Sequence, residues 1–394
     1  MTTWISTAEA AQRLGVKPET VYAYVSRGLL VSRPAPGGRG SVLAREQVDA
    51  LAAGGRRGRG STRVHRFRSV STSVSHSSAD ALYYRGTEVA AWSRDHRLED
   101  GVELVLGVRP GAGSPEDAPP ALPVREREGL ARAPLERRVA GAVLRWAERG
   151  WGTTTEPGRA ARVVAGAVPA LGDALGLPGP SPGGDVGLSA RVLVALTGRM
   201  PQPDEERAAD TLLLQLLDHG LTASTTATRA AASARAGIAD CLLAGYAALA
   251  GAAHGAASAR MHRLLAAEMS QPGSVDPGAA ARAAGFGHFL YRDGDPRAEA
   301  ALSSWATVAA AEPVLQALQR LRRRLPPERE HEPNVDAAIA VATVTLGLAP
   351  GAGPALFAWA RTAGLAAHAA EELGEDLLRW RGRAATRAAG PPGP

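Results

Sequence analysis

Three histidines and one aspartate in the C-terminal half of the chain have the types and the order of an acid–base site. Glycine stands beside each of the histidines, which are His219, His254 and His288, in segments that resemble the ends of helices rich in alanine and leucine. Asp336 follows them in the sequence Pro-Asn-Val-Asp. Imidazole and carboxylate groups are the usual proton carriers near neutral pH. These residues therefore predict a site that removes and donates protons.

Each of these residues also has a plainer interpretation. A histidine beside glycine is often a hydrogen-bonded residue in a helix turn, or an incidental part of a glycine-rich turn. Asp336 stands at the head of the helix predicted from Ala337, where it would either cap that helix or hold a carboxylate near the positive end of the helix dipole. Because all four residues occur in one ordered series, the acid–base interpretation is favoured.

The elements that must hold these residues are predicted to be helices. From Arg125 onward, the content of Ala, Leu and Arg and an apolar spacing of about 3.6 residues favour helix. Proline and glycine predict the main breaks, at Leu177–Gly187, Gln271–Gly278, Pro326-Pro327 and Pro350–Pro354. The fold class is therefore mainly α, all-α beyond residue 110, with a few short strands near residue 70.

Composition narrows the class of protein further. The 394 residues carry a net charge of +6, which is modest for this length. One cysteine, Cys241, excludes a disulfide within the chain and a cysteine-rich zinc site, and is expected to be a small buried residue. Val335–Ala360 is apolar but holds Asp336 and two prolines, so it predicts two buried helices rather than a membrane span. The start Met1–Trp4 has no signal-peptide pattern, and we expect a cytoplasmic protein.

The ordered motifs resemble the citrate synthase family over roughly residues 68 to 390. They are Asp218-His219-Gly220, Gly251-Ala252-Ala253-His254-Gly255, Gly285-Phe286-Gly287-His288, Asp295-Pro296-Arg297-Ala298 and Pro333-Asn334-Val335-Asp336. The resemblance implies a two-domain helical fold and a homodimer. The large domain would comprise residues 68–254 and 341–394, and the small domain residues 255–340.

The resemblance also implies the activity and the role of each group. Citrate synthases of the tricarboxylic acid cycle condense acetyl-CoA with oxaloacetate and hydrolyse the product to citrate and CoA. Asp336 matches the base that deprotonates the methyl group of acetyl-CoA. His254 matches the group that stabilises the enol, and His288 the group that polarises the ketone of oxaloacetate. Acetyl-CoA is a substrate here, and no metal or redox cofactor is implied.

Further residues are implied to bind the two substrates. A dicarboxylate needs cations, and arginine suits it through bidentate pairing. The substrate-binding set would be His219, Arg297, Arg361 and Arg381. Of these, Arg381 would reach the partner subunit's site, although a solvated basic tail is an equally favoured interpretation. The CoA-binding set would be Gly285, Phe286, Gly287 and Arg292.

The chain departs from the family pattern at two loops. Alanines replace family residues on both sides of His254, and Phe289 follows His288 where the family often has arginine. No residue decides between acetyl-CoA and propionyl-CoA, so 2-methylcitrate synthase is one alternative. A catalytically weak, DNA-binding metabolite sensor on a citrate synthase scaffold is the other.

The first 53 residues resemble the helix-turn-helix head of MerR-type or excisionase-like regulators. Ser6-Thr7-Ala8-Glu9 predicts a capped first helix, Pro18 a second helix, Pro36–Gly40 a hairpin and Gln47–Leu51 the start of another helix. A basic, glycine-rich linker is predicted over residues 54–67. DNA binding is one interpretation of this head, and a module for protein contacts or regulation is the other. The candidate DNA-contacting residues are Lys17, Glu19, Thr20, Tyr22 and Tyr24.

Overall fold

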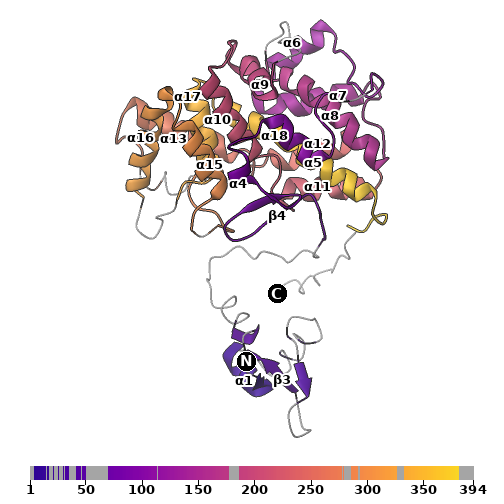
Figure 1. The fold of residues 1–394 in the computed structure, drawn as a ribbon, viewed down its shortest axis with the longest axis vertical. Helices are drawn as coiled ribbons and strands as arrows, with labels where there is room; N and C mark the ends of the chain where they lie inside the picture. Colours follow the sequence, from indigo (N-terminus) through magenta and orange to yellow (C-terminus); the bar gives the residue numbers. More distant parts are fainter. Residues whose placement is uncertain are drawn as a thin grey trace, which may run out of the picture. The chain divides into compact units, whose positions relative to one another are not determined.

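A computed structural model of the chain describes residues 4–14, 16, 21, 25, 30, 32–34, 41–45, 47–49, 70–112, 114–176, 186–276, 278, 285–291, 293–325 and 332–380. The chain divides into two compact units, Met1–Val70 and Ser71–Pro394 (Figure 1). Each unit has its own hydrophobic core.

The first unit combines a short helix with a three-stranded antiparallel sheet. Its elements are β1 (Trp4–Ser6), α1 (Thr7–Leu14), β2 (Ser32–Pro34) and β3 (Ser41–Ala44), with β3 between the other two strands. The predicted cap of α1 is confirmed, because the Ser6 hydroxyl accepts the amide hydrogen of Glu9 at 3.2 Å. Pro34 pairs with Ser41, which agrees with the predicted hairpin. The hairpin loop, the basic linker and the candidate DNA-contacting residues lie outside the described residues.

The second unit is helical apart from one small antiparallel sheet, which confirms the predicted fold class. The strands are β4 (Ser75–Ser77), β5 (Leu82–Tyr84) and β6 (Thr87–Glu88). Arg85 and Gly86 join β5 to β6 with positive φ angles of 45° and 88°. Two such residues in succession are typical of the tightest hairpin turns.

The helices of the second unit follow this sheet in the chain. They are α4 (Val89–Trp92), α5 (Leu98–Leu106), α6 (Val124–Arg132), α7 (Arg138–Ala147), α8 (Pro157–Asp173), α9 (Leu188–Thr197), α10 (Pro203–Leu214), α11 (Ala223–Ser233), α12 (Ile238–Leu249), α13 (Ala257–Ser270), α15 (Pro296–Trp305), α16 (Glu312–Arg323), α17 (Val335–Thr345) and α18 (Ala352–Leu373), with short 3₁₀ turns at Leu135–Arg137 and Ala309–Ala311.

The central helix is α18, which packs against α8, α11 and α12 (Figure 1). Every residue from Ala352 to Ala369 is buried. A helix that is apolar on all sides belongs in a core, and the small side chains of α18 let its neighbours approach closely. The predicted break at Pro350–Pro354 needs one correction, because α18 already begins at Ala352. Pro354 fits in the first turn, where an amide hydrogen has no partner within the helix.

The apolar stretch Val335–Ala360 forms α17 and the first half of α18, as predicted. Among the described residues, none of the helices is both long enough and apolar enough to cross a membrane. Cys241 is fully buried in α12, also as predicted. The division of the second unit into a large and a small domain stays a prediction.

Candidate active site

The loop that carries His219 is fixed through its backbone. It runs from the end of α10 to the start of α11. The buried hydroxyl of Tyr84 lies 3.0 Å from the carbonyl oxygen of Leu214 and 3.1 Å from both the nitrogen and the carbonyl oxygen of Asp218. The amide of Gly364 in α18 donates to the carbonyl of Leu217 at 3.2 Å, and a Cβ at Gly364 would lie 2.2 Å from that oxygen. Only glycine therefore fits where α18 meets this loop.

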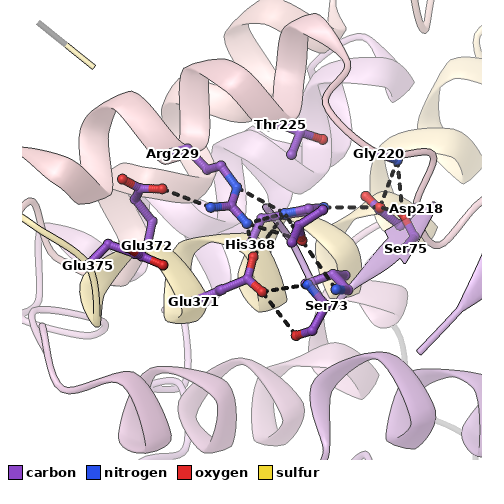
Figure 2. A network of polar contacts seen from close by, with 12 residues as sticks. Ser73, Ser75, Asp218, Gly220, Thr225, Arg229, His368, Glu371, Glu372 and Glu375 are labelled. Atoms are coloured by element: carbon purple, nitrogen blue, oxygen red, sulfur yellow. Dashed lines mark hydrogen bonds and ion pairs between the residues drawn. The ribbon is translucent and has the colours of Figure 1, made fainter. Parts of the chain in front are cut away.

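Asp218 anchors the same loop through its side chain (Figure 2). Its Oδ2 accepts hydrogen bonds from the Ser75 hydroxyl, from the Gly220 amide at 2.9 Å and from Nε2 of His368 at 3.0 Å. Burial by itself raises the pKa of Asp218, but His368 and Arg361 lower it by more, and the net shift is downward. Asp218 is therefore a buried, ionised carboxylate that ties the loop to β4 and α18.

The contacts of His368 continue into α11 and the end of α18. Nε and Nη2 of Arg229 donate to Nδ1 of His368 at 3.0 and 2.9 Å, so the ring proton lies on Nε2 and faces Asp218. Arg229 is fully buried and pairs with Glu372 at 2.8 Å and with Glu371. Figure 2 shows this series of contacts as a network that extends from Asp218 through His368 and Arg229 to Glu371 and Glu372.

The ring of His219 contacts His288 and Tyr291, two aromatic residues in the segment after Gly287. Its Nε2 lies 2.9 Å from the hydroxyl of Tyr291, and its centroid lies 5.3 Å from that of His288, edge to face. Burial and the charges of Arg297 and Arg361 lower the pKa of His219 far below its ordinary value. His219 is therefore a neutral hydrogen-bonding group.

His288 has a defined tautomer. Its Nδ1 accepts the amide hydrogen of Leu290 at 3.2 Å, which places the ring proton of the neutral form on Nε2. Burial and the charge of Arg297 lower the pKa of His288 to about 4. At neutral pH this residue is an N–H donor rather than a cation.

His254 lies between α12 and α13 and contacts the start of α11. Its Nε2 is 2.9 Å from the hydroxyl of Ser224, in the first turn of that helix. Its ring is 6.0 Å from that of Phe357. Burial and the charge of Arg361 lower the pKa of His254 to about 4, so it too is neutral at pH 7.

Arg297 is held in place by the residue two positions before it. Nε and Nη2 of Arg297 donate to the two carboxylate oxygens of Asp295 at 2.9 and 2.8 Å. Asp295 Oδ2 also accepts the amide hydrogen of Val335 at 3.0 Å, which joins the start of α15 to the start of α17. Burial alone lowers the pKa of Arg297, but Asp295 raises it by more, so the buried side chain stays a cation.

Arg361 is a buried cation with unused donors. The side chain is completely enclosed in α18, and Nε donates to the carbonyl of Leu216 at 2.8 Å. Neither Nη1 nor Nη2 has a hydrogen-bond partner among the described residues. A buried guanidinium with free donors is costly unless an anion completes it. Arg361 is therefore built to receive an anionic group.

Asp336 lies in the first turn of α17 but does not cap it. Asn334 is the cap, and its side-chain oxygen accepts the amide hydrogen of Asp336 at 3.0 Å. The carboxyl of Asp336 accepts a hydrogen bond from the backbone of Ser258, at the start of α13. Burial raises its pKa to about 7, in spite of the charge of Arg297. Asp336 is thus a carboxyl that exchanges a proton near neutral pH.

The segment of His288 and the segment of Asp336 are joined by backbone hydrogen bonds. The amide of Gly287 donates to the carbonyl of Glu332 at 2.9 Å, and the amide of Asn334 to the carbonyl of Gly285 at 3.0 Å. Gly287 has a φ of 71°, which favours glycine. At Gly285, a Cβ would lie 2.5 Å from the sulfur of Met261, so packing against α13 already requires glycine there.

The structure brings most of the predicted residues together. The charge of Arg297 acts on the pKa of His219, His288 and Asp336, and that of Arg361 on the pKa of His219 and His254. Two predicted residues, Arg292 and Arg381, lie outside the described part of the chain. Sequence reasoning assigned no role to several supporting residues, namely Ser224, Tyr291, Asp218, His368, Arg229 and Asp295.

A separate cavity of about 870 Å³ lies along α15 and α16. It borders Asp295, but none of the three histidines lines it. Its carboxylates include Asp80, Asp293, Glu299 and Glu332. An acidic lining repels carboxylates and phosphates, so this cavity does not suit the anions that Arg361 would receive.

Together these groups suit carbon acid chemistry next to an anion site. A carboxyl with a pKa near 7 is well matched to removing a proton at neutral pH. Neutral imidazole N–H groups stabilise a developing oxyanion, and buried arginines hold carboxylates.

Two protein families match parts of this chain. Residues 171–383 match the citrate synthase C-terminal domain family, and residues 4–56 match a helix-turn-helix domain family. The putative citrate synthase 2 of Mycobacterium tuberculosis is 34% identical over 197 residues, which cover 47% of this chain and 52% of that protein. Citrate synthase 2 of Bacillus subtilis is 29% identical over 212 residues, covering 52% and 57%. The chain thus spans about half the length of these curated relatives.

Solved structures show the same fold at low identity. A citrate synthase from Thermoplasma acidophilum, in a ternary complex with carboxymethyl coenzyme A and oxaloacetate, is 22% identical with a TM-score of 0.66, covering 82% of this chain and 96% of that one. The citrate synthase of Pyrobaculum aerophilum is also 22% identical, with a TM-score of 0.62, covering 92% and 96%.

Proposed function

This chain belongs to the citrate synthase family, and on that premise we propose that it condenses acetyl-CoA with oxaloacetate and water to give citrate and CoA. The observation that carries the proposal is the buried guanidinium of Arg361, whose Nη1 and Nη2 have no partner among the described residues. A dicarboxylate supplies the missing acceptors. Arg297 and His219 lie within electrostatic reach of the same site.

In this proposal, Asp336 takes a proton from the methyl group of the thioester. Its pKa of about 7 makes it a stronger base than an ordinary carboxylate while leaving it largely ionised just above neutral pH. The electrons move onto the thioester oxygen, where the N–H of neutral His254 stabilises the enol. Ser224, at 2.9 Å, occupies Nε2 of that ring and leaves Nδ1 to face the thioester.

The enol carbon then attacks the ketone carbon of oxaloacetate. The Nε2–H of His288 hydrogen-bonds the ketone oxygen and donates its proton as that oxygen becomes an alcohol, and the proton that Asp336 took from the methyl group returns to His288 through solvent. Water hydrolyses the resulting thioester, which releases CoA and leaves a third carboxylate. We further infer that residues 255–340 close over the substrates and that Gly285, Phe286, Gly287 and Arg292 contact CoA.

Thiol release from acetyl-CoA by the purified protein, with and without oxaloacetate, tests this proposal. We expect release that depends on oxaloacetate and falls by a factor of about 10³ or more in Asp336→Ala. The exposed Asp240, in the first turn of α12, supplies the matched control, and Asp240→Ala should keep the full rate. A folded wild-type protein that releases no thiol from either acetyl-CoA or propionyl-CoA would overturn the enzymatic proposal.

The same assay with propionyl-CoA addresses the alternative of 2-methylcitrate synthase. One methylene group in an apolar pocket changes discrimination by about 1–3 kcal/mol, or about 10- to 200-fold. The thioester with the higher kcat/KM identifies the substrate.

A second candidate function is favoured by the match of residues 4–56 to a helix-turn-helix domain. In that proposal the body senses oxaloacetate or an acyl-CoA, and the head binds DNA. A homodimer would present two heads, as palindromic half-sites require. A DNA gel shift that responds to oxaloacetate, from a protein without turnover, would support the sensor and contradict the enzyme.

A further inference from the structure

Tyr291 lies at the centre of the site and has no assigned role. It is 2% exposed, and its ring contacts three groups of the site. The guanidinium of Arg297 lies 5.5 Å above the ring, the ring of His288 is 4.9 Å away, and the hydroxyl lies 2.9 Å from Nε2 of His219. The Ser77 hydroxyl is also hydrogen-bonded to Tyr291. The orientation of the ring and the hydroxyl is thus fixed from several sides.

His219 has to donate a hydrogen bond if it contacts oxaloacetate, as the proposed function assumes. Carboxylates and a ketone offer only acceptor atoms. The ring is neutral, since burial and nearby cations lower the pKa of His219, so only one of its nitrogens carries a proton. Nε2 faces Tyr291, and Nδ1 has no partner among the described residues. A ligand can therefore be reached only by Nδ1.

We propose that Tyr291 is a positioning residue that sets the tautomer of His219. The Tyr291 hydroxyl donates to Nε2 of His219, the ring proton lies on Nδ1, and Nδ1–H points to a carboxylate or ketone oxygen of the substrate. Ser77 donates in turn to the oxygen of Tyr291. This inference rests on the proposed function only for the identity of the ligand, because the tautomer is a property of the free protein.

Two amide substitutions at His219 distinguish its two nitrogens. The amide nitrogen of asparagine replaces Nδ1 and that of glutamine replaces Nε2. We expect His219→Gln to raise the KM for oxaloacetate by about 30-fold more than His219→Asn does, which is the cost of a lost hydrogen bond to a charged group. The opposite order would overturn the proposal.

Tyr291→Phe keeps the ring over Arg297 and removes only the hydroxyl. We expect the KM for oxaloacetate to rise about tenfold, with the KM for acetyl-CoA unchanged, because the unpaired ring then populates mainly the Nε2–H tautomer and the KM rises by the inverse of the remaining Nδ1–H fraction. Tyr83→Phe is the matched control, since Tyr83 lies in the neighbouring hairpin and stacks on His76 outside the site. Equal kinetics for Tyr291→Phe and Tyr83→Phe would contradict a positioning role.

Nitrogen NMR of protein with labelled histidines reports the tautomer of His219 without any turnover. The signal of His219 is identified as the one that is absent from the spectrum of His219→Asn. An Nδ1–H signal at His219 that is lost or averaged in Tyr291→Phe would support the proposal. An Nε2–H signal in the wild type would overturn it. An inactive wild-type enzyme with the Nδ1–H tautomer would refute the proposed function and leave the tautomer assignment standing.

Discussion

At the scale of single residues, the proposed site depends on side chains whose ordinary charge is altered by burial. The site combines two neutral histidines, His254 and His288, with a carboxyl whose pKa is raised, Asp336. The buried cations contribute to the low pKa of each histidine, because Arg361 opposes a positive charge on His254 and Arg297 opposes one on His288. In the proposed site, the neutral imidazoles therefore act as hydrogen-bond donors, and the aspartate removes the proton from the thioester methyl group.

The pH dependence of kcat/KM should follow from the pKa of Asp336. Its free-enzyme pKa is raised to about 7, so the protonated, inactive form accumulates below that pH. We expect kcat/KM to fall about tenfold per pH unit below pH 7 and to reach a plateau above it. The histidines, whose pKa values are about 4, add no limb between pH 5 and 8. A pH–rate profile that is flat from pH 5 to 8 would exclude Asp336 as the base.

Substitution of Arg361 should separate binding from stability. Arg361→Met removes the cost of burying a cation whose Nη atoms have no partner among the described residues, but it also loses the hydrogen bond to Leu216 and the attraction to Asp218. Because these effects oppose each other, we expect an unfolding free energy within about 1 kcal/mol of wild type, but oxaloacetate affinity reduced by about 100-fold or more, through the loss of two charge-assisted hydrogen bonds. Calorimetric titration and urea unfolding measure both.

The exposed Arg94 provides the control for that substitution, and Arg94→Met should change neither quantity. An Arg361→Met protein that unfolds at much lower urea concentration would show instead that Arg361 supports the fold. Unchanged oxaloacetate binding would contradict the role of Arg361 as an anion receptor.

At this scale, a sequence can indicate residues that share a local motif, but it does not indicate a contact between residues far apart in the chain. The order of the histidines and Asp336 predicted residues that the structure places under the influence of the same cations. The cap of α17 could also have been found locally, because Asn334 has the right residue type for it. Tyr291 could not, since its role depends on His219, 72 residues away, and no spacing rule links the two.

At the scale of elements, α18 and α11 support the loop of Asp218 and His219. The network of Arg229, His368 and Asp218 connects residues 139 to 150 positions apart. Composition and apolar spacing predicted that the chain is mostly helical beyond Arg125. The buried charged residues interrupt that spacing, and the sequence does not indicate which residues they pair with. Buried charges need partners, and only the packed helices reveal which ones.

Breaking this network should destabilise the second unit strongly. Arg229→Met leaves Nδ1 of His368 without its donor and Glu371 without its buried cation. Removing one partner of a buried ion pair costs about 3–5 kcal/mol, so we expect a loss of about 3 kcal/mol in unfolding free energy. Urea unfolding followed by circular dichroism measures it.

An exposed ion pair gives the comparison for Arg229→Met. Arg109 pairs with Glu103, with 60% and 47% of their side chains exposed, and Arg109→Met should have little effect because exposed pairs contribute little. Similar losses in the two variants would mean that the network contributes no more than a surface contact.

At the scale of the whole molecule, the two units have hydrophobic cores of very different size. The core of the first unit consists of Ile5, Ala10, Ala11, Val21, Leu30, Leu43 and Val48 among the described residues, whereas the core of the second extends through most of its helices. Small domains bury a smaller fraction of their surface on folding and are correspondingly less stable. The sequence predicted this division from the glycine- and arginine-rich composition of residues 54–67.

Because the cores are separate, the chain should unfold in two steps by scanning calorimetry. We expect the first unit to melt at the lower temperature and the second at the higher. A ligand stabilises only the unit that binds it, by about 2.7 kcal/mol at a concentration of 100 times its Kd. Oxaloacetate should therefore raise the temperature of the second transition and leave the first unchanged, since every residue proposed to bind it lies beyond residue 218. A single transition, or an equal shift of both, would show that the head and the body are energetically coupled, which is what a ligand-responsive DNA-binding sensor requires.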